Sequence, residues 1–528
     1  MGLRNALGRA QAVVTWMDQQ QKQRSSLTVQ AFWLLVAKTL AFVFAFALPV
    51  LLTRTLSQSE YGLFKQVFLI VTTATAFLPL GFGMSAFYYL PREKNEKRRG
   101  QVILNILLFN LLIGTAACLL LVLWPGLIAR IFQDPTVPKY SALVGAVILV
   151  WLFSAFLEIV AVANQELRLA TVFIVFGQLS RTVLLLAAAI VFDSVTALIY
   201  AALIHGIVQS LVLLWYVSSR FPHFWRAFDW SLTGKQVAYA LPFGFAGLLY
   251  TVQTDAHNYV VSHKFSPAIF AIYSIGVAQV PLIGVLRDSV SSVILPRISY
   301  LQEQGQAREI LVLMASAVRK LAAFYLPMYF VLLITGREFL TFMFTPAYLQ
   351  SWPIFAINLT LLPISLIEVD AVIRAYERHR FFLVAVQLVM SALMIVAVWF
   401  GVARFGLVGA ISAVVVVNFL MRIVLAARFS RVLGAKWRDV ALFKDLGKVA
   451  MASGVAALVT FLVHSMVTAS ATRPFYVLVI CGAVYCAVYV PAIVLLRIPT
   501  SDEWDKLRLG VGRLQRVVYL RRSADSVP

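Results

Sequence analysis

Two long apolar runs lie almost end to end in the first half of the chain. Residues 170–192 read ATVFIVFGQLSRTVLLLAAAIVF, and residues 195–217 read VTALIYAALIHGIVQSLVLLWYV. Each run is long enough for an α-helix to cross the roughly 30 Å apolar core of a bilayer, which needs about 20 residues. We therefore expect two consecutive transmembrane helices joined by a very short turn.

The composition extends this expectation to the whole chain. Of the 528 residues, 61% are hydrophobic and only 13% are charged, whereas soluble globular domains average about 25% charged residues. This excludes a soluble multidomain enzyme and predicts a polytopic membrane protein. The cysteines lie in apolar runs without metal-ligand spacing, so we expect no metal and no other cofactor. They are Cys118, Cys481 and Cys486.

Apolar stretches of spanning length recur along the entire sequence. They predict an all-α integral membrane protein with about 14 transmembrane helices. The expected spans are 28–52, 62–90, 101–124, 140–163, 170–192, 195–217, 237–262, 268–292, 318–336, 352–374, 381–402, 407–427, 446–467 and 475–496.

The positive charges are distributed unevenly between the two sides of these spans. The chain has 45 Lys and Arg residues against 23 Asp and Glu, a formal net charge of +22. With the N-terminus inside, the inside segments hold about four times as many Lys and Arg residues as the outside loops. The bias predicts a multi-pass protein of the cytoplasmic (inner) membrane with both termini in the cytoplasm. It also accounts for the net charge without nucleic acid as a partner.

An internal repeat relates the two halves of the chain. The segment 157–162 at the end of span four resembles 367–372 at the end of span ten, 210 positions later. Leu90-Pro91-Arg92 after span two is repeated as Leu295-Pro296-Arg297 after span eight. Because the period covers an even number of spans, both copies enter the membrane in the same direction. We expect two pseudo-symmetric six-helix lobes followed by two C-terminal helices.

This repeat predicts the domain boundaries. We expect a cytoplasmic amphipathic segment at 1–27, an N-lobe at 28–217, a cytoplasmic interlobe linker at 218–236, a C-lobe at 237–427, spans 13 and 14 with a preceding basic loop at 428–496, and a basic cytoplasmic tail at 497–528.

Sequence motifs of ATP-driven and catalytic proteins are missing. No Gly-x-x-x-x-Gly-Lys-Ser/Thr loop is present, so the chain cannot itself be an ATPase. The expected outside loops are short and contain no Asp-x-Asp pair for glycosyl transfer. We therefore expect a transporter and not an enzyme.

Three motifs resemble one family of transporters. The segment 54–64, which ends in Glu60-Tyr-Gly-Leu-Phe64, follows span one; Leu241-Pro242 begins span seven; and residues 295–299 follow span eight. They resemble the Wzx-type flippases of the multidrug/oligosaccharidyl-lipid/polysaccharide (MOP) exporter superfamily, whose layout is also six plus six plus two spans. The chain departs from the family pattern at residues 57–59, where glycine and proline are usual, and at 271–273, which lacks the glycine expected before the tyrosine.

The resemblance implies a function in cell-surface polysaccharide, lipopolysaccharide or exopolysaccharide biosynthesis. Such a flippase moves a lipid-linked oligosaccharide, usually on undecaprenyl pyrophosphate, from the inner to the outer leaflet by alternating access. The partners it implies are that substrate and membrane lipids, with a polysaccharide polymerase and chain-length machinery as further candidates.

Two cations lie deep inside predicted spans of the N-lobe. Lys38 is in span one and Arg181 is in span five, both at about 15 Å depth for a rise of 1.5 Å per residue. A cation at mid-span normally faces a cavity or a partner. We expect both to line a cationic central cavity for the pyrophosphate; the alternative is that each pairs with a carboxylate or a backbone carbonyl.

Span seven carries most of the polar candidates of the C-lobe. Gln253 and His257 share a helical face and are cavity candidates, whereas Asp255 lies on another face and is a coupling or gating candidate. The alternative is that these residues form a polar cap at the interface near the outer surface. Pro242, Gly244 and Gly247 make this span bendable, so we assign them to gating as well.

The last cavity candidate is Arg287, near the inner end of span eight. An ion pair within or between helices is the alternative role for this residue.

Two other functions remain open at this point. A cation-coupled multidrug antiporter of the same superfamily usually has twelve spans and an acidic N-lobe cavity, which the cations of this chain disfavour. A membrane-embedded polysaccharide polymerase or ligase is disfavoured by the short outer loops.

Overall fold

The computed structural model describes residues 36–134, 136–226, 228–278, 283–367, 376, 380–469 and 473–498. The predicted amphipathic segment 1–27 lies outside the described residues, and so does the basic tail from residue 499 onward.

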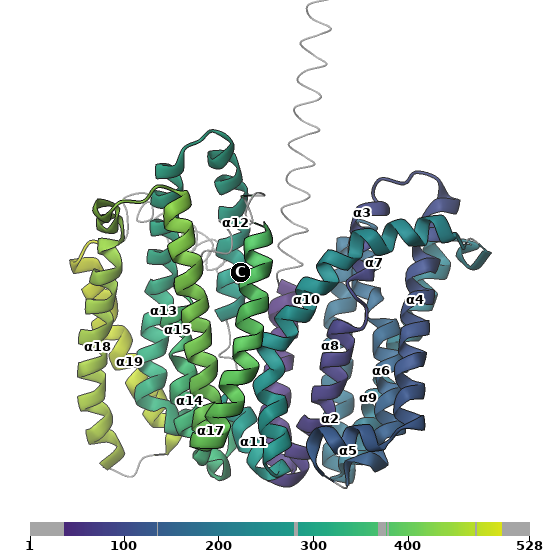
Figure 1. The fold of residues 1–528 in the computed structure, drawn as a ribbon. Coiled ribbons are helices and arrows are strands. Elements are labelled where there is room, and N and C mark those ends of the chain that lie inside the picture. Colours follow the sequence, from purple (N-terminus) through teal and green to yellow (C-terminus); the bar gives the residue numbers. More distant parts are fainter. Residues whose placement is uncertain are drawn as a thin grey trace, which may run out of the picture. The chain divides into compact units, whose positions relative to one another are not determined.

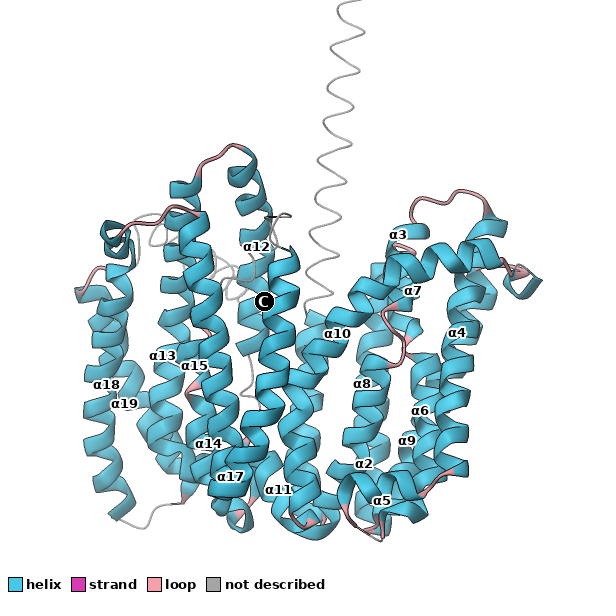
Figure 2. Cartoon of the chain, in the orientation of Figure 1, coloured by secondary structure: helices cyan, strands magenta, loops and turns pink. Residues whose placement is uncertain are grey.

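The described part of the chain is built of helices, and the all-α membrane prediction is confirmed (Figure 2). Within it, nine helices are long and apolar enough to cross a membrane, and a bent pair, Gln58–Phe77 with Phe82–Tyr89, makes a tenth. The expected number of about 14 spans stays a prediction. The nine are Val36–Thr55, Glu96–Leu123, Val137–Ala163, Leu167–Phe192, Val195–Arg220, Ala307–Phe344, Phe381–Val432, Trp437–Ala469 and Pro474–Leu495.

Two expected spans form the element α17 (Arg380–Val432), which consists of two helices joined at a kink (Figure 1). The kink lies at Gly406, whose φ of 58° and ψ of −137° are not helical. Glycine adopts a positive φ at little cost because it has no Cβ. Gly406 thus marks the turn expected between spans 11 and 12.

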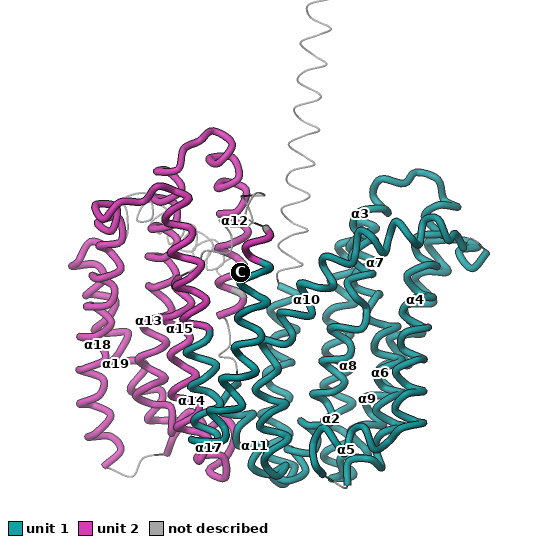
Figure 3. The backbone as a smooth tube through the Cα atoms, in the orientation of Figure 1, with its two compact units in different colours: residues 1–281, 384–417 teal, residues 282–383, 418–528 magenta. Residues whose placement is uncertain are grey.

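The chain divides into two compact units (Figure 3). Unit 1 comprises residues 1–281 and 384–417, and unit 2 comprises 282–383 and 418–528. The division into two six-helix lobes, which was expected from the repeat, stays a prediction.

Besides the helix Val36–Thr55 and part of α17, unit 1 contains the elements from α2 to α11. They are α2 (Gln58–Phe77), η1 (Phe82–Met84), α3 (Ser85–Tyr89), α4 (Glu96–Leu123), α5 (Gly126–Phe132), η2 (Val137–Tyr140), α6 (Ser141–Ser154), α7 (Phe156–Ala163), α8 (Leu167–Phe192), α9 (Val195–Arg220), η3 (Phe224–Arg226), α10 (Trp230–Lys264) and α11 (Pro267–Gly276).

Helix α2 has well-defined ends. At its start the Ser57 hydroxyl accepts a hydrogen bond from the Glu60 N–H, and the Glu60 carboxylate accepts one from the Ser57 N–H. This capping box satisfies two backbone N–H groups at the helix start and so fixes where α2 begins. At the other end Leu80 and Gly81 have positive φ values of 48° and 69°. They bend the chain by 42° between α2 and the segment that ends at Tyr89.

The core of unit 1 is formed where α3, α4, α7 and α9 pack together. Its fully buried residues include Ile103, Ile106, Val160 and Leu213. Since water is absent from the core and from the surrounding lipid alike, close packing and buried hydrogen bonds hold such helices together.

Unit 2 contains the remaining elements. They are α12 (Ile283–Glu303), α13 (Ala307–Phe344), η4 (Pro346–Ser351), α14 (Trp352–Leu359), α15 (Leu361–Ile364), the rest of α17, η6 (Trp437–Phe443), α18 (Lys444–Ala469) and α19 (Pro474–Leu495).

The last two helices of unit 2 pack on α13. The Tyr489 hydroxyl donates to the carbonyl of Ala323 at 2.9 Å, and the Tyr485 hydroxyl donates to the carbonyl of Ser453 at 3.1 Å. Buried tyrosines are stable in apolar surroundings when the hydroxyl has such a partner. α18 and α19 therefore belong to the packed body of unit 2.

Candidate functional site

The cation predicted in span five, Arg181, lies inside unit 1. Its side chain extends from α8 over the indole ring of Trp151 in α6, with 4.6 Å between the guanidinium carbon and the ring centroid. The same ring packs edge-on against His205 of α9 at 5.8 Å. The Nε atom of Arg181 is buried and has no hydrogen-bond partner. Arg181 is thus held by an aromatic ring and retains an unused donor.

A second cation, Lys65 of α2, reaches the same region. Lys65 is half-buried, and its ammonium lies 5.6 Å from the ring centroid of Tyr61. Arg181 acts electrostatically on both Lys65 and His205, which places the three groups close together. We call Lys65, Arg181, Trp151 and His205 the cationic cluster.

The cationic cluster carries no compensating negative charge. In the part of the chain that the structure describes, neither Lys65 nor Arg181 forms an ion pair with a carboxylate. A cation inside a membrane span costs about 2.5–3.5 kcal/mol, and a cation–π contact offsets about 0.5–2 kcal/mol of that. The arrangement therefore favours an anionic ligand that supplies the missing charge.

Sequence reasoning missed Lys65. The expected span 62–90 places the residue only three positions from the span's start, and it was not among the cavity candidates. In the structure α2 begins at Gln58, so Lys65 lies two turns inside a helix. The sequence contained one signal for this position. Lys65 follows Tyr61 by four residues, and side chains at i and i+4 share a helical face, so the lysine could be expected to contact the tyrosine ring.

The other predicted cation, Lys38, has a different environment. It lies near the start of the described part of its helix and is exposed. Among the described residues it makes no hydrogen bond or ion pair. Its assignment to a cavity stays a prediction.

The polar residues predicted in span seven contact different partners along α10. Gln253 donates to the carbonyl of Gln387 at 3.1 Å. His257 is buried, and its Nδ1 lies 3.0 Å from the hydroxyl of Tyr273. Each residue is thus bonded to a neighbouring helix of unit 1. Their cavity roles stay predictions.

The coupling candidate Asp255 takes part in a polar seam between α2 and α10. Its carboxylate accepts a hydrogen bond from the Thr73 hydroxyl at 3.2 Å. Further along the same seam, the buried amide of Gln66 donates to the carbonyl of Ser262 at 3.4 Å. Between them the Tyr259 hydroxyl donates to the carbonyl of Leu69 at 3.4 Å. We call these three contacts the α2–α10 seam. A helix pair joined by few hydrogen bonds can separate at modest cost.

The gating candidates of α10 differ in their surroundings. The helix continues through Pro242, which is exposed. At Gly244 an added Cβ would lie 2.3 Å from the carbonyl oxygen of Leu80, so only glycine permits this close approach to the bend after α2. At Gly247 an added Cβ would meet nothing within 4 Å. Gly244 therefore has a packing role, and the bending roles stay predictions.

The last candidate, Arg287, lies in α12 of unit 2. Its side chain is half-buried. Its role in a cavity stays a prediction.

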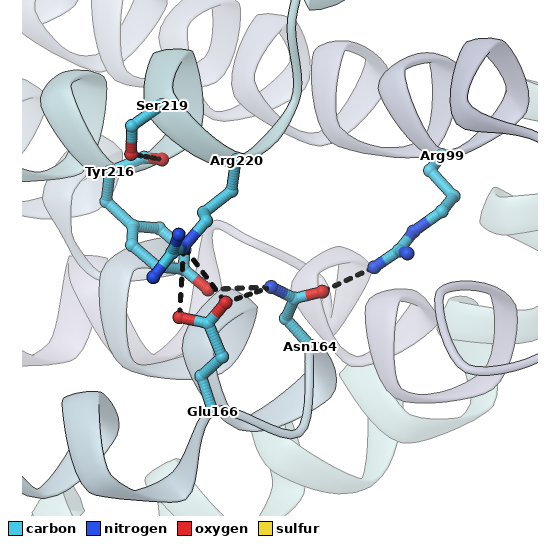
Figure 4. A network of polar contacts seen from close by, with 6 residues as sticks. All are labelled: Arg99, Asn164, Glu166, Tyr216, Ser219 and Arg220. Carbon is cyan, nitrogen blue, oxygen red and sulfur yellow. Dashed lines mark hydrogen bonds and ion pairs between the residues drawn. The ribbon is translucent and has the colours of Figure 1, made fainter.

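A separate polar network lies where α4 begins, α7 meets α8 and α9 ends (Figure 4). Asn164 accepts from Arg99 and donates to both Glu166 and Tyr216 at 3.0 Å. Glu166 also forms an ion pair of 3.0 Å with Arg220. Each of these residues bonds to another member, although the buried Nε of Arg99 has no partner among the described residues. The network therefore ties the helix ends to one another.

The comparisons with known proteins agree with this architecture. The family described as polysaccharide biosynthesis protein matches residues 51–353, more than half of the chain. No curated protein matches the sequence.

Solved structures show the fold. The lipid II flippase MurJ in an inward closed conformation is similar with a TM-score of 0.68 at 14% identity, over 88% of this chain and 98% of that one. An inward-facing multidrug resistance MATE transporter of the MOP superfamily gives 0.57 at 13% identity, over 76% and 96%. A MOP superfamily transporter from Pyrococcus furiosus, described by the reverse polarity of its binding pocket, gives 0.54 at 13% identity, over 77% and 95%.

The resemblance found in the sequence motifs is thereby confirmed. The profile match covers the capped start of α2 and the whole of α10, which carry two of those motifs. The helical fold around them matches transporters of one superfamily. The chain belongs to the polysaccharide biosynthesis protein family and has the membrane transporter fold of the MOP superfamily.

Proposed function

We propose that the protein translocates a lipid-linked oligosaccharide, joined to its polyprenyl carrier through pyrophosphate, across the cytoplasmic membrane. The family match supports a place in polysaccharide biosynthesis, and the fold supports transport across a membrane. The apolar carrier stays in the bilayer, and the charged and glycosylated head passes through the protein.

The observation that carries this proposal is the cationic cluster. Lys65 and Arg181 lie together in unit 1 without a carboxylate partner among the described residues. Two opposite unit charges about 4 Å apart attract by about 4 kcal/mol at an effective dielectric constant near 20. A pyrophosphate supplies the negative charge that the two cations lack, and they replace part of its hydration shell during passage.

Translocation of an anion also has a natural energy source. The chain contains no ATP-binding loop. A membrane potential that is negative inside favours movement of each negative charge outward by about 2.3 kcal/mol per 100 mV. Alternating access coupled to this potential, or to an ion gradient, suffices to drive export of a pyrophosphate-linked glycan.

The second candidate function is that of a cation-coupled multidrug antiporter of the same superfamily. The MATE transporters among the similar structures support it at the level of fold. The cationic cluster opposes it, because Lys65 and Arg181 repel a cationic drug. A membrane-embedded polymerase or ligase is a third reading, and no described residues form a group suited to metal-assisted catalysis.

The decisive experiment compares both cargo classes in one preparation. The full chain is reconstituted in liposomes with a membrane potential, and two probes are offered. One is an undecaprenyl-pyrophosphate-linked trisaccharide with a fluorescent label that external dithionite destroys; the other is the cationic dye ethidium. We expect transbilayer movement of the glycolipid alone. Movement of ethidium without movement of the glycolipid would establish the antiporter instead.

A further inference from the structure

Aromatic side chains gather where α3 ends beside α10. The rings of Tyr88 and Tyr239 lie 4.8 Å apart, and Tyr89 contacts both, at 5.0 Å from Tyr88 and 6.2 Å from Tyr239. Phe243 follows one turn along α10 at 5.4 Å from Tyr239. The guanidinium of Arg92 lies over the Tyr88 ring at 3.6 Å. We call these five residues the aromatic cluster.

The aromatic cluster has open surfaces and unused polar groups. The side chains of Tyr88 and Phe243 are 39% and 51% exposed. Throughout the described residues, no hydrogen bond engages the phenol hydroxyl of Tyr88, Tyr89 or Tyr239. Three donor–acceptor groups, one guanidinium and an exposed ring therefore lie within one site.

The surrounding sequence locates the aromatic cluster near one membrane surface. Arg92 belongs to the loop 91–100, which contains five Lys or Arg residues, and the positive-inside bias assigns that loop to the cytoplasm. The helix α2 precedes α3 on the same bent span. Lys65 of the cationic cluster lies in the first half of α2, toward the other end of that span. One bent span thus contributes Lys65 to the cationic cluster and Tyr88 and Tyr89 to the aromatic cluster.

We propose that the aromatic cluster binds the sugar portion of the substrate on the cytoplasmic side before translocation. This proposal rests on the proposed function, because it identifies a second subsite for the same cargo. A pyranose ring has a face of C–H groups and a rim of hydroxyls. The C–H face packs on an exposed aromatic ring such as Phe243, and the rim hydroxyls bond to the phenols and to Arg92. Ligand sites typically combine aromatic walls with a few placed polar groups in this way.

A simple interfacial belt of aromatic residues does not account for the arrangement. Belt residues stand at the lipid surface as single amphipathic rings; Trp215, which is 63% exposed and has no ring contact among the described residues, is such a residue. In the aromatic cluster the rings contact one another across two helices, and an arginine is stacked on one of them. The mutual contacts give a preformed surface.

The test measures binding of two probes by the purified full chain in detergent. The probes are undecaprenyl pyrophosphate without sugar and undecaprenyl pyrophosphate bearing a trisaccharide. The wild type should bind the glycosylated probe more tightly. Phe243→Leu and Tyr239→Leu should each weaken binding of that probe about 3- to 10-fold, as expected for loss of one aromatic contact. Binding of the sugar-free probe should stay unchanged.

Two controls separate a binding role from a structural one. Tyr239→Phe retains the ring and should keep most of the affinity, losing only the hydroxyl contact. Trp225→Leu removes a ring that is 55% exposed on η3, outside the cluster, and should bind both probes like the wild type.

The outcomes distinguish this proposal from the proposed function. Leucine variants that bind the glycosylated probe as tightly as the wild type, or that lose both probes equally, would overturn the sugar subsite and leave pyrophosphate recognition standing. A wild type that binds neither probe would contradict the proposed function itself.

Discussion

The guanidinium of Arg181 lies 4.6 Å from the ring centroid of Trp151, and the same indole contacts His205 on its edge. A cation in an apolar span is thus oriented by an aromatic ring, and no carboxylate of the described residues neutralises it. The cation–π contact leaves the full positive charge available to a ligand.

The first prediction concerns the ring that orients Arg181. Trp151→Phe keeps a weaker cation–π partner, whereas Trp151→Leu removes it, so transport should fall in the order wild type, Phe, Leu. Measured in the liposome assay with the pyrophosphate-linked trisaccharide, the Leu variant should lose about 3- to 30-fold, the equivalent of about 0.7–2 kcal/mol. A Leu variant of normal abundance with wild-type transport would show that the ring does not position the arginine.

The second prediction distinguishes the role of Lys65 in transport from that of Lys38. Lys65→Ala and Arg181→Ala should each cut translocation about 5- to 150-fold, since a hydrogen-bonded charge contributes about 1–3 kcal/mol. Lys38→Ala tests the cavity role expected from the sequence: a comparable loss would support it, and wild-type transport would reject it.

The matched control for this series is Arg130→Ala. Arg130 also lies over an indole, that of Trp124 at 5.7 Å, but it is exposed on α5 and outside the cluster. It should transport like the wild type. Normal translocation by a well-expressed Lys65→Glu, Arg181→Glu double variant would reject the cationic mechanism.

The third prediction concerns the α2–α10 seam. Cysteines at Gln66 and Ser262, joined by a reducible bifunctional thiol reagent, should stop translocation if this seam has to open. Reduction should restore the rate. Each single-cysteine variant, treated in the same way, serves as the control for labelling of native thiols. Full transport by the cross-linked protein would mean that α2 and α10 stay together throughout the cycle.

The fourth prediction concerns close helix approach. An added Cβ at Gly62 would lie 1.7 Å from the carbonyl oxygen of Pro267, and one at Gly244 would lie 2.3 Å from that of Leu80. Gly62→Ala and Gly244→Ala should each lower the free energy of unfolding by about 1–3 kcal/mol through overpacking. Gly247→Ala has open space and should be tolerated. Thermal unfolding in detergent measures the difference, and equal stability of all three variants would contradict the packing.

The fifth prediction concerns topology. Reporters that are active in the cytoplasm should work when fused after Arg98, Arg226 or Arg516, and periplasmic reporters should work after Pro135 or Pro346, as the positive-inside bias requires. An external C-terminus would contradict an even number of spans.

The helix-end contacts illustrate how far the internal repeat extends into structure. In unit 1 the Tyr216 hydroxyl near the end of α9 bonds to Asn164 at 3.0 Å. In unit 2 Arg422 near the end of α17 donates to the carbonyl of Ile367 at 3.1 Å. At the repeat offset of 210 positions, Ile367 and Arg422 correspond to residues 157 and 212, so the two contacts do not occupy corresponding places. The similarity between the two halves of the sequence therefore did not specify these helix-end contacts, which required the folded chain.

The sequence by itself determined the all-α membrane fold, because hydropathy is a local property that each segment carries whatever its neighbours are. Its motifs determined the family. It also identified Arg181 as an intramembrane cation. Only the tertiary structure decided which groups meet that cation. Lys65 lies near Arg181 because of where α2 begins and how α2, α6, α8 and α9 are rotated about their axes, whereas the role of Lys38 stays a prediction. The rotation of each helix is set by packing against all the others, which no single segment specifies.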